Sequence, residues 1–167
     1  MWRQIQAKFT RQKARLSVVR KMIELGVKVE DRYRLKVGGM SVSDSALAEA
    51  AGVDRRVVRN TVNQIMSDPD LRTIFTRVKP IGTSLVDIAE NLGYSVLVVY
   101  ADPHKPGVIS GISSILSEYG VVIRQALADD PDFTPDPKLT LVVDGRVPPE
   151  AIAKIQSLTL VESLTLK

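Results

Sequence analysis

The hydrophobic pattern of the first 25 residues has the spacing of an amphipathic helix. Between residues 2 and 25, apolar side chains recur at gaps of three and four positions, which places them along one helix face. Gly26 then provides a helix stop. Lys8, Arg11 and Arg15 fall on a separate stripe of the same helix. We predict one long helix that packs on its own domain, with a basic stripe that either faces solvent or contacts phosphate or a second helix.

A two-residue period follows in residues 32–37, where apolar and basic side chains alternate. This period is typical of a half-buried strand. Gly38-Gly39 supplies two positions for positive φ, so the chain can turn tightly and return through Met40–Val42 as a small hairpin. One side of the strand, which either faces solvent or contacts phosphate, carries the basic residues Arg32, Arg34 and Lys36.

The spacing of residues 43–66 predicts two short helices joined by a glycine turn. Ser43 or Asp44 can cap a helix that ends at Ala51, and Asp54 can cap a second helix through Met66. Gly52 permits a left-handed turn between them. This segment resembles the helix-turn-helix of bacterial and archaeal transcription regulators, in which the second helix enters the DNA major groove.

Carried over to this sequence, the resemblance implies a set of outward residues on the second helix. Arginine can bind guanine and asparagine can bind adenine through paired hydrogen bonds, so these residue types suit base edges. The expected DNA-binding residues are Arg55, Arg56, Arg59, Asn60 and Asn63. The alternative is a helix-turn-helix scaffold that does not touch DNA.

The following segment reads as a joint between two domains. Pro69 ends the second helix, residues 71–78 fit either a strand or a short helix, and Thr83 can cap a connector helix that ends at Gly93. We therefore expect a helix-turn-helix domain in residues 1–66 and a linker with a connector helix in residues 67–93.

The remaining residues, 94–167, follow the order strand, helix, strand, strand, helix, strand. A split βαββαβ order predicts an antiparallel, ferredoxin-like sheet with two helices on one face, so the chain as a whole belongs to the α+β class. The expected strands and helices cover residues 95–101, 107–119, 121–128, 138–143, 148–155 and 160–166.

Three short segments of this half resemble the ACT domain, a ferredoxin-like regulatory module that binds amino acids, usually across a dimer. They are the turn His104-Lys105-Pro106-Gly107, the segment from Glu118 to Ile123, and the closing Val161-Glu162-Ser163-Leu164. The whole chain is similar to archaeal predicted regulators of amino-acid metabolism that join a helix-turn-helix to an ACT domain. The resemblance implies a homodimer that binds double-stranded DNA and an amino acid or related small carboxylate.

The turn chemistry agrees with an effector site at the start of the helix after Gly107. A glycine there allows close backbone approach, and free N–H groups at a helix N-terminus favour a carboxylate, while Asp102 can hold an ammonium group. The expected effector-binding residues are Asp102, His104, Lys105, Pro106, Gly107, Val108, Val122 and Arg124. The alternative is an ACT-like domain that only assembles subunits.

Charge supports two different tasks for the two halves. The chain of 167 residues has a net charge of +4, but residues 1–66 contain 14 Lys and Arg against 6 Asp and Glu, whereas residues 91–167 contain 6 against 9. A basic half is typical of proteins that bind a polyanion, although a solvated surface explains the charge equally well.

Several function classes are excluded or disfavoured. Zero cysteines and one histidine rule out thiol nucleophiles, disulfides and cysteine-based zinc sites. The longest apolar run, Val96–Ala101, is far shorter than the roughly 20 residues of a membrane helix, and the basic N-terminus lacks a secretory hydrophobic core. The aspartates of residues 129–137 lack the EF-hand pattern, and no phosphate-binding loop, dinucleotide motif or catalytic carboxylate pair is recognisable.

We therefore expect a cytoplasmic DNA-binding regulator of amino-acid metabolism with no membrane partner, no enzymatic activity, no cofactor and no metal. Two alternatives remain at this point. The C-terminal domain could act only in oligomerisation, or the protein could be a regulatory subunit of an amino-acid biosynthetic enzyme.

Overall fold

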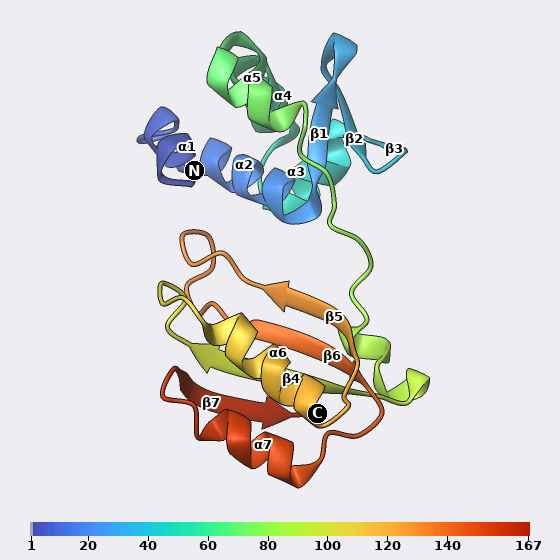
Figure 1. The fold of residues 1–167 in the computed structure, drawn as a ribbon. Helices are drawn as coiled ribbons and strands as arrows, with labels where there is room; N and C mark the ends of the chain where they lie inside the picture. Colours follow the sequence, from blue (N-terminus) through green and yellow to red (C-terminus); the bar gives the residue numbers. More distant parts are fainter. Residues whose placement is uncertain (1) are drawn as a thin grey trace. The chain divides into compact units, whose positions relative to one another are not determined.

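The computed structural model describes residues 2–167, apart from the side chain of Arg32. The chain divides into two compact units, Met1–Gly82 and Thr83–Lys167 (Figure 1). Among the described residues, no helix has both the length and the apolar character needed to cross a membrane.

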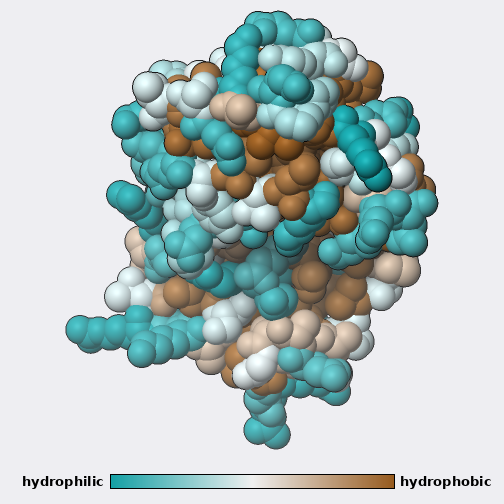
Figure 2. All heavy atoms as spheres, turned by 90° about the horizontal axis from the view of Figure 1, so that it is seen from below, coloured by the Kyte–Doolittle hydropathy of each residue, from teal (hydrophilic) through white to brown (hydrophobic). Residues whose placement is uncertain are grey.

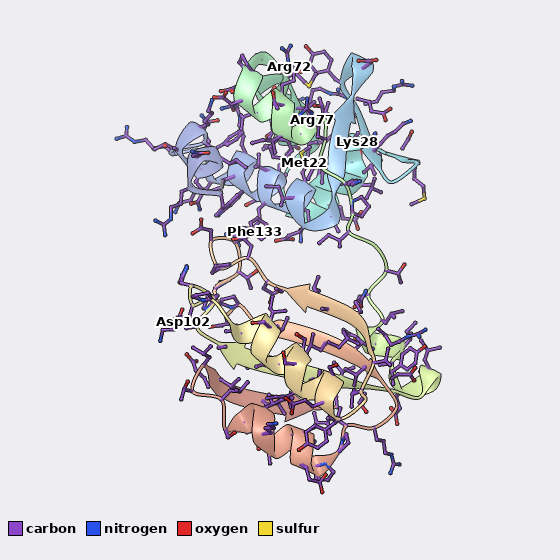
Figure 3. All side chains as sticks on the ribbon, viewed as in Figure 1. Met22, Lys28, Arg72, Arg77, Asp102 and Phe133 are labelled. Atoms are coloured by element: carbon purple, nitrogen blue, oxygen red, sulfur yellow. The ribbon has the colours of Figure 1, made fainter. Side chains whose placement is uncertain are left out.

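The N-terminal unit combines short helices with a three-stranded antiparallel sheet in which β2 lies between β1 and β3 (Figure 1). The helices of the described residues are α1 (Trp2–Lys8), α2 (Lys13–Leu25), α3 (Asp44–Ala51), α4 (Arg55–Ser67) and α5 (Pro69–Phe75). The strands are β1 (Val27–Glu30), β2 (Arg34–Val37) and β3 (Met40–Val42). Met22, on α2, points into the core of this unit (Figure 3) and is completely buried.

The first helix is broken, so the prediction of one helix over residues 2–25 is wrong. α1 ends at Lys8 and α2 begins at Lys13, with Arg11 at a left-handed φ of 64° between them. The apolar face survives the break, because Ile5 and Phe9 are each only 1% exposed. The hydrophobic periodicity therefore identified the buried side chains correctly but did not reveal the turn.

Two of the three residues of the predicted basic stripe, Lys8 and Arg15, form contacts within the N-terminal unit. Lys8 Nζ lies 2.6 Å from carboxylate oxygens of both Asp68 and Asp70, and its hydrogen bond to Asp68 raises the pKa of Lys8. Gln64 donates from Nε2 to the Lys8 carbonyl at 3.1 Å and accepts from Arg15 at 2.7 Å. Lys8 and Arg15 therefore hold α1 and α2 against the junction of α4 and α5.

The sheet also departs from the predicted hairpin. β2 begins at Arg34, because Asp31–Tyr33 forms a 3-10 turn with Tyr33 at a φ of 61°. β1 was not predicted, and it pairs with β2 along its whole length. In the hairpin loop only Gly38 has a positive φ, of 56°, so the expectation that Gly39 shares it is wrong.

α3 and α4 form the helix-turn-helix that the spacing predicts. The Ser43 hydroxyl accepts a hydrogen bond from the Ala46 N–H at 3.1 Å, and the Asp54 carboxylate accepts from the Arg56 N–H at 2.7 Å. Gly52 joins the helices at a φ of 65°. Both caps thus satisfy N–H groups that a helix start leaves free. The buried side chains of α4 are Val58, Thr61, Val62 and Ile65.

Gly26 ends α2 in the left-handed conformation, with a φ of 65°. The backbone of residues 79–80 passes close by: a Cβ atom at position 26 would lie 2.3 Å from the Pro80 nitrogen and 2.6 Å from the Lys79 carbonyl carbon. Both the backbone conformation and the available space therefore require glycine at this position.

The segment expected to be a linker is divided between the two units. α5 belongs to the N-terminal unit and buries Leu71 and Phe75. The expected connector helix from Thr83 is absent, and the 3-10 turns Val86–Ile88 and Glu90–Leu92 take its place. Gln125 explains the difference, because its side chain accepts from the Leu85 N–H at 2.9 Å and donates to the Thr83 carbonyl at 2.8 Å.

The C-terminal unit is a four-stranded antiparallel sheet in the order β5-β6-β4-β7, with α6 and α7 on one face (Figure 1). This arrangement confirms the predicted α+β, split βαββαβ fold. Its elements are β4 (Tyr94–Ala101), α6 (Val108–Glu118), β5 (Ile123–Ala128), β6 (Leu139–Asp144), α7 (Pro149–Gln156) and β7 (Val161–Leu166).

Alternate residues of the central strands serve two apolar layers. Leu97 and Val99 of β4 pack with Ile112, Leu116 and other buried residues of the helical layer. On the opposite face, the buried side chains share a smaller cluster with part of the 83–93 segment: Ala89, Val96, Val98 and Val142.

Candidate functional site

The exposed face of α4 is the first candidate site. Its N-terminus is capped by Asp54, and the apolar side chains beginning at Val58 hold the opposite face in the core. All five side chains that the sequence places toward DNA are exposed: Arg55, Arg56, Arg59, Asn60 and Asn63. The helix thus presents hydrogen-bond donors of the kind that bind base edges and phosphates.

The three arginines of this face differ in their surroundings. The guanidinium of Arg59 forms an ion pair with Asp44, at the start of α3, and lies 3.4 Å from the Tyr33 carbonyl oxygen. Within the described part of the chain, no ion pair involves Arg55 or Arg56. Arg55 and Arg56 are therefore the arginines of α4 best able to engage an anionic partner.

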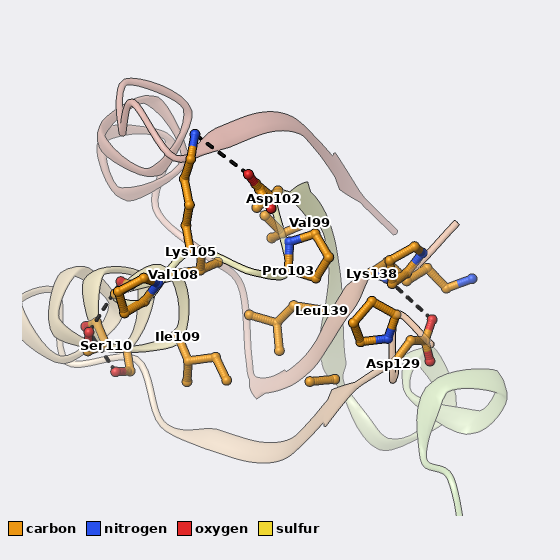
Figure 4. A pocket seen from close by; sticks show the side chains of 17 residues that line it. Val99, Asp102, Pro103, Lys105, Val108, Ile109, Ser110, Asp129, Lys138 and Leu139 are labelled. Atoms are coloured by element: carbon orange, nitrogen blue, oxygen red, sulfur yellow. Dashed lines mark hydrogen bonds and ion pairs between the residues drawn. The ribbon is translucent and has the colours of Figure 1, made fainter. Parts of the chain in front are cut away.

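The second candidate site is a cavity of about 600 Å³ at one end of the C-terminal sheet (Figure 4). It lies between the loop after β4, the first turns of α6 and the β5–β6 connection. The apolar part of its wall includes Val99, Val108, Ile109 and Leu139. Cavities of this size and composition are typical of small-molecule sites in proteins.

Charged groups lie at the edge of this cavity. Asp102 accepts a hydrogen bond from the His104 N–H at 3.0 Å, and this bond lowers the pKa of the Asp102 carboxyl. Lys105 Nζ lies 3.6 Å from the same carboxylate (Figure 4). Across the cavity, the Asp129 carboxylate accepts from the Lys138 N–H at 3.3 Å. The wall therefore offers two carboxylates and two ammonium groups around an apolar interior.

Gly107 lies directly before α6 and has a φ of 100°. A Cβ atom there would meet only Leu160 Cδ1, at an ordinary 3.6 Å. The backbone conformation therefore favours glycine here, and the close approach of a ligand to this position stays a prediction.

The structure brings together five of the eight expected effector residues: Asp102, Lys105, Pro106, Gly107 and Val108 all line the cavity. The His104 side chain is exposed and does not line it. Figure 3 places Asp102 in the loop that follows β4, next to α6.

Val122 and Arg124 do not belong to this cavity. β5 runs antiparallel to β6, which is itself antiparallel to β4, so the start of β5 lies at the Tyr94 end of the sheet. There Arg124 lies 4.0 Å from Asp144 and 5.3 Å from the centre of the Tyr94 ring. The expectation that Val122 and Arg124 face the turn at Gly107 is therefore wrong.

Sequence reasoning missed the other wall of the cavity. Residues from the β5–β6 connection complete it: Ala128, Asp129, Pro131, Pro137 and Lys138. The dense aspartates and prolines of this connection predicted only a loop, and nothing local indicates that the loop lies against the start of α6. Within residues 2–167, no cluster of His, Cys, Asp and Glu side chains suits a metal ion.

Comparisons with known proteins give only distant similarities. No protein-family model matches the chain, and a search of curated proteins finds no match. A transcriptional regulatory protein of the AsnC family from Pyrococcus furiosus is 13% identical, with a TM-score of 0.28, over 75% of this chain and 77% of its own.

Two further solved structures are similar at the same level. A transcriptional regulator from Neisseria meningitidis, in complex with L-methionine, is 13% identical over 93% of this chain and 87% of its own, with a TM-score of 0.27. The leucine response regulatory protein of Mycobacterium tuberculosis is 17% identical over 93% and 90%, with a TM-score of 0.26. Because similarities this distant do not establish a shared function, the proposals below rest on the side chains of this chain.

Proposed function

We propose that the protein is a DNA-binding transcriptional regulator of amino-acid metabolism. The observation that carries this proposal is the exposed start of α4, where Arg55 and Arg56 form no ion pair with any described side chain, on a helix fixed by the Asp54 cap. The second helix of a helix-turn-helix reads base edges in the major groove through residues of its first turns. The basic charge of residues 1–66 supports the same partner.

A binding-site selection from random duplexes, followed by gel-shift titration, tests this proposal. We expect salt-sensitive binding, because each phosphate contact releases counterions. Arg56→Ala is expected to weaken a selected site by about 1–3 kcal/mol if Arg56 reads a base. Arg72, exposed on α5 (Figure 3), gives a matched control in Arg72→Ala. If Arg56→Ala and the double variant Arg56→Ala/Arg59→Ala both bind as tightly as the wild type, α4 is not the recognition helix.

We further propose that the cavity of the C-terminal unit binds an amino acid with an apolar side chain. Its apolar interior suits that side chain, Asp102 suits the ammonium group, and the start of α6 suits the carboxylate. A free amino acid carries both charges a few bonds from its side chain, which matches a cavity with charged groups at its edge and an apolar interior.

Isothermal titration calorimetry with the twenty amino acids tests the effector proposal. Saturable heat from apolar amino acids, together with weaker binding by Asp102→Asn, is the expected result. Absence of heat from every amino acid would favour the alternative in which this domain only assembles subunits. A stoichiometric enzyme recovered with the protein would instead favour a regulatory subunit.

We also propose a homodimer that presents two helix-turn-helix units to paired half-sites. β5 and β7 are the edges of the C-terminal sheet, and unpaired edges are usually covered or paired. Figure 2 shows hydrophobic surface between hydrophilic side chains, and the C-terminal unit exposes the large apolar side chains of Ile109, Val122 and Leu166. Light scattering measures the mass of the full chain in solution. The mass of a monomer at about 10 µM would count against a homodimer.

A further inference from the structure

A second pocket, in the N-terminal unit, joins the start of α4 to residues that the proposals above do not use. It measures about 340 Å³ and lies between the β2–β3 hairpin, the start of α3 and the start of α4. Its lining is largely polar, and it contains the side chains of Arg34, Ser41, Ser45, Arg55 and Arg59. One arginine of β2 and two arginines of α4 thus bring three guanidinium groups to one pocket.

The charges of this pocket leave an unbalanced positive site. Asp44 is the one acidic side chain of its lining, and it forms an ion pair with Arg59. Arg34 donates from Nε to the Asp31 carbonyl at 3.4 Å, which leaves its terminal nitrogens for another acceptor. Among the residues with described side chains, no ion pair involves Arg34 or Arg55. Two guanidinium groups therefore remain for an anion.

Two lysines of the same sheet have different surroundings from Arg34. Lys36, on the same strand as Arg34, lies 3.0 Å from Glu30, and Lys28 lies 2.7 Å from the same carboxyl group. These two contacts lower the pKa of Glu30 to about 2. Both lysines thus share one carboxylate, whereas no described carboxylate forms an ion pair with Arg34.

We propose that this pocket binds one backbone phosphate of DNA, with Arg34 and Arg55 as the charged ligands and Ser41 and Ser45 as hydroxyl donors. Arginine forks match phosphate oxygens, and hydroxyls and helix starts are common phosphate contacts. The proposal rests on the proposed DNA-binding function. It adds a contact from the β2–β3 hairpin to the DNA backbone beside the groove that α4 would enter.

Fluorescence anisotropy with a random-sequence duplex of about 20 base pairs, two turns of DNA, tests the proposal without knowledge of the operator. Arg34→Gln is expected to weaken binding about 3- to 10-fold, the ordinary net effect of losing one hydrogen bond. The slope of log K against log salt concentration is expected to fall by about 0.9, the value for one phosphate. Arg34→Lys keeps the charge but loses the fork, so it is expected to restore the slope and only part of the affinity.

Arg72→Gln on α5 is the matched control and is expected to leave both affinity and slope unchanged. Thermal melts monitored by circular dichroism establish that the exposed substitutions leave the fold intact. If the wild type binds the duplex and Arg34→Gln binds it with the same affinity and slope, this inference is wrong and the proposed DNA binding stands. If the wild type does not bind the duplex at about 50 mM salt, the proposed function fails and this inference fails with it.

Inorganic phosphate distinguishes DNA from a soluble phosphorylated ligand. In an NMR titration at constant ionic strength, the amide signals of Ser41 and Ser45 are expected to shift without saturating below about 1 mM phosphate. Saturation below that concentration, abolished by Arg34→Gln, would assign the pocket to a free phosphoryl ligand and overturn the assignment to DNA.

Discussion

Gly26 and Gly52 offer a matched test of what a close backbone approach costs. Both end helices of the N-terminal unit with a φ of 65°, and their ψ angles of 33° and 39° are nearly equal. An alanine therefore meets the same local strain at either position, about 1–2 kcal/mol for a left-handed L-residue. The surroundings differ, because nothing lies within 4 Å of a Cβ atom at position 52, whereas the Pro80 nitrogen would lie 2.3 Å from one at position 26.

The expected magnitudes follow from this difference. Gly52→Ala is expected to lower the free energy of unfolding by about 1 kcal/mol, the strain less the smaller backbone entropy of the unfolded alanine chain. Gly26→Ala carries the same cost and must also displace the backbone of residues 79–80, an overpacking cost of about 1–3 kcal/mol. The total for Gly26→Ala is then about 2–4 kcal/mol.

Urea denaturation followed by tryptophan fluorescence is the appropriate assay. Trp2 is the single tryptophan of the chain and is 3% exposed within the N-terminal unit, so its emission reports the unfolding of that unit. Gly145→Ala, at a φ of 67° in the other unit, serves as a control that is expected to leave this transition unchanged. Equal losses for Gly26→Ala and Gly52→Ala would refute the role assigned to the contact with Pro80.

Three further predictions concern pH, the effector cavity and the recognition helix. The pKa of Glu30 is about 2 in the folded chain against 4.5 unperturbed. Its contribution to stability is therefore full above pH 4.5 and is lost as the pH falls toward 2. The urea midpoint of Glu30→Gln is expected to vary less with pH in that window than the midpoint of the wild type. Gly107→Val places a β-branched residue at a φ of 100°, at a cost of about 1–3 kcal/mol, and is expected to abolish effector heat in calorimetry; undiminished heat would place the effector elsewhere. Asp54→Ala removes the cap of α4 and is expected to lower the stability of the fold by about 1 kcal/mol, measured by thermal melting, and to weaken DNA binding. An unchanged melting temperature would mean that the cap does not stabilise α4.

Local signals in the sequence were sufficient for the helix-turn-helix and for the elements of the C-terminal unit. Gly52 fixes the turn of the helix-turn-helix through its backbone conformation, and Asp54 does so through a capping hydrogen bond to an N–H group two residues later. The positions of these two residues therefore predict the turn directly. The C-terminal strands and helices were equally accessible, because each carries its own period and is bounded by turn residues. The break at Arg11 was not accessible, because it depends on contacts of Lys8 with residues 60 and 62 positions away.

The candidate sites show the same limit at larger distances. Arg59 has the residue type and position of a base reader, but its ion pair with Asp44 arises from the packing of α4 on α3. Arg124 was expected beside Gly107, but strand register places it at the other end of the sheet. The residue types of a site can thus be predicted from a sequence, whereas the side chains that surround them depend on topology and strand register.

The prolines around the C-terminal cavity bear on how fast a ligand is captured. Four of the lining residues are prolines: Pro103, Pro106, Pro131 and Pro137. A pyrrolidine ring fixes φ near −65°, so these four residues have less backbone freedom to lose when a ligand enters than other residue types would have. If the cavity binds the proposed effector, we expect a smaller ordering cost and an association rate set mainly by diffusion and orientation. Selectivity between the proposed effectors is then expected to lie in their residence times, because differences in affinity between related ligands lie mainly in dissociation.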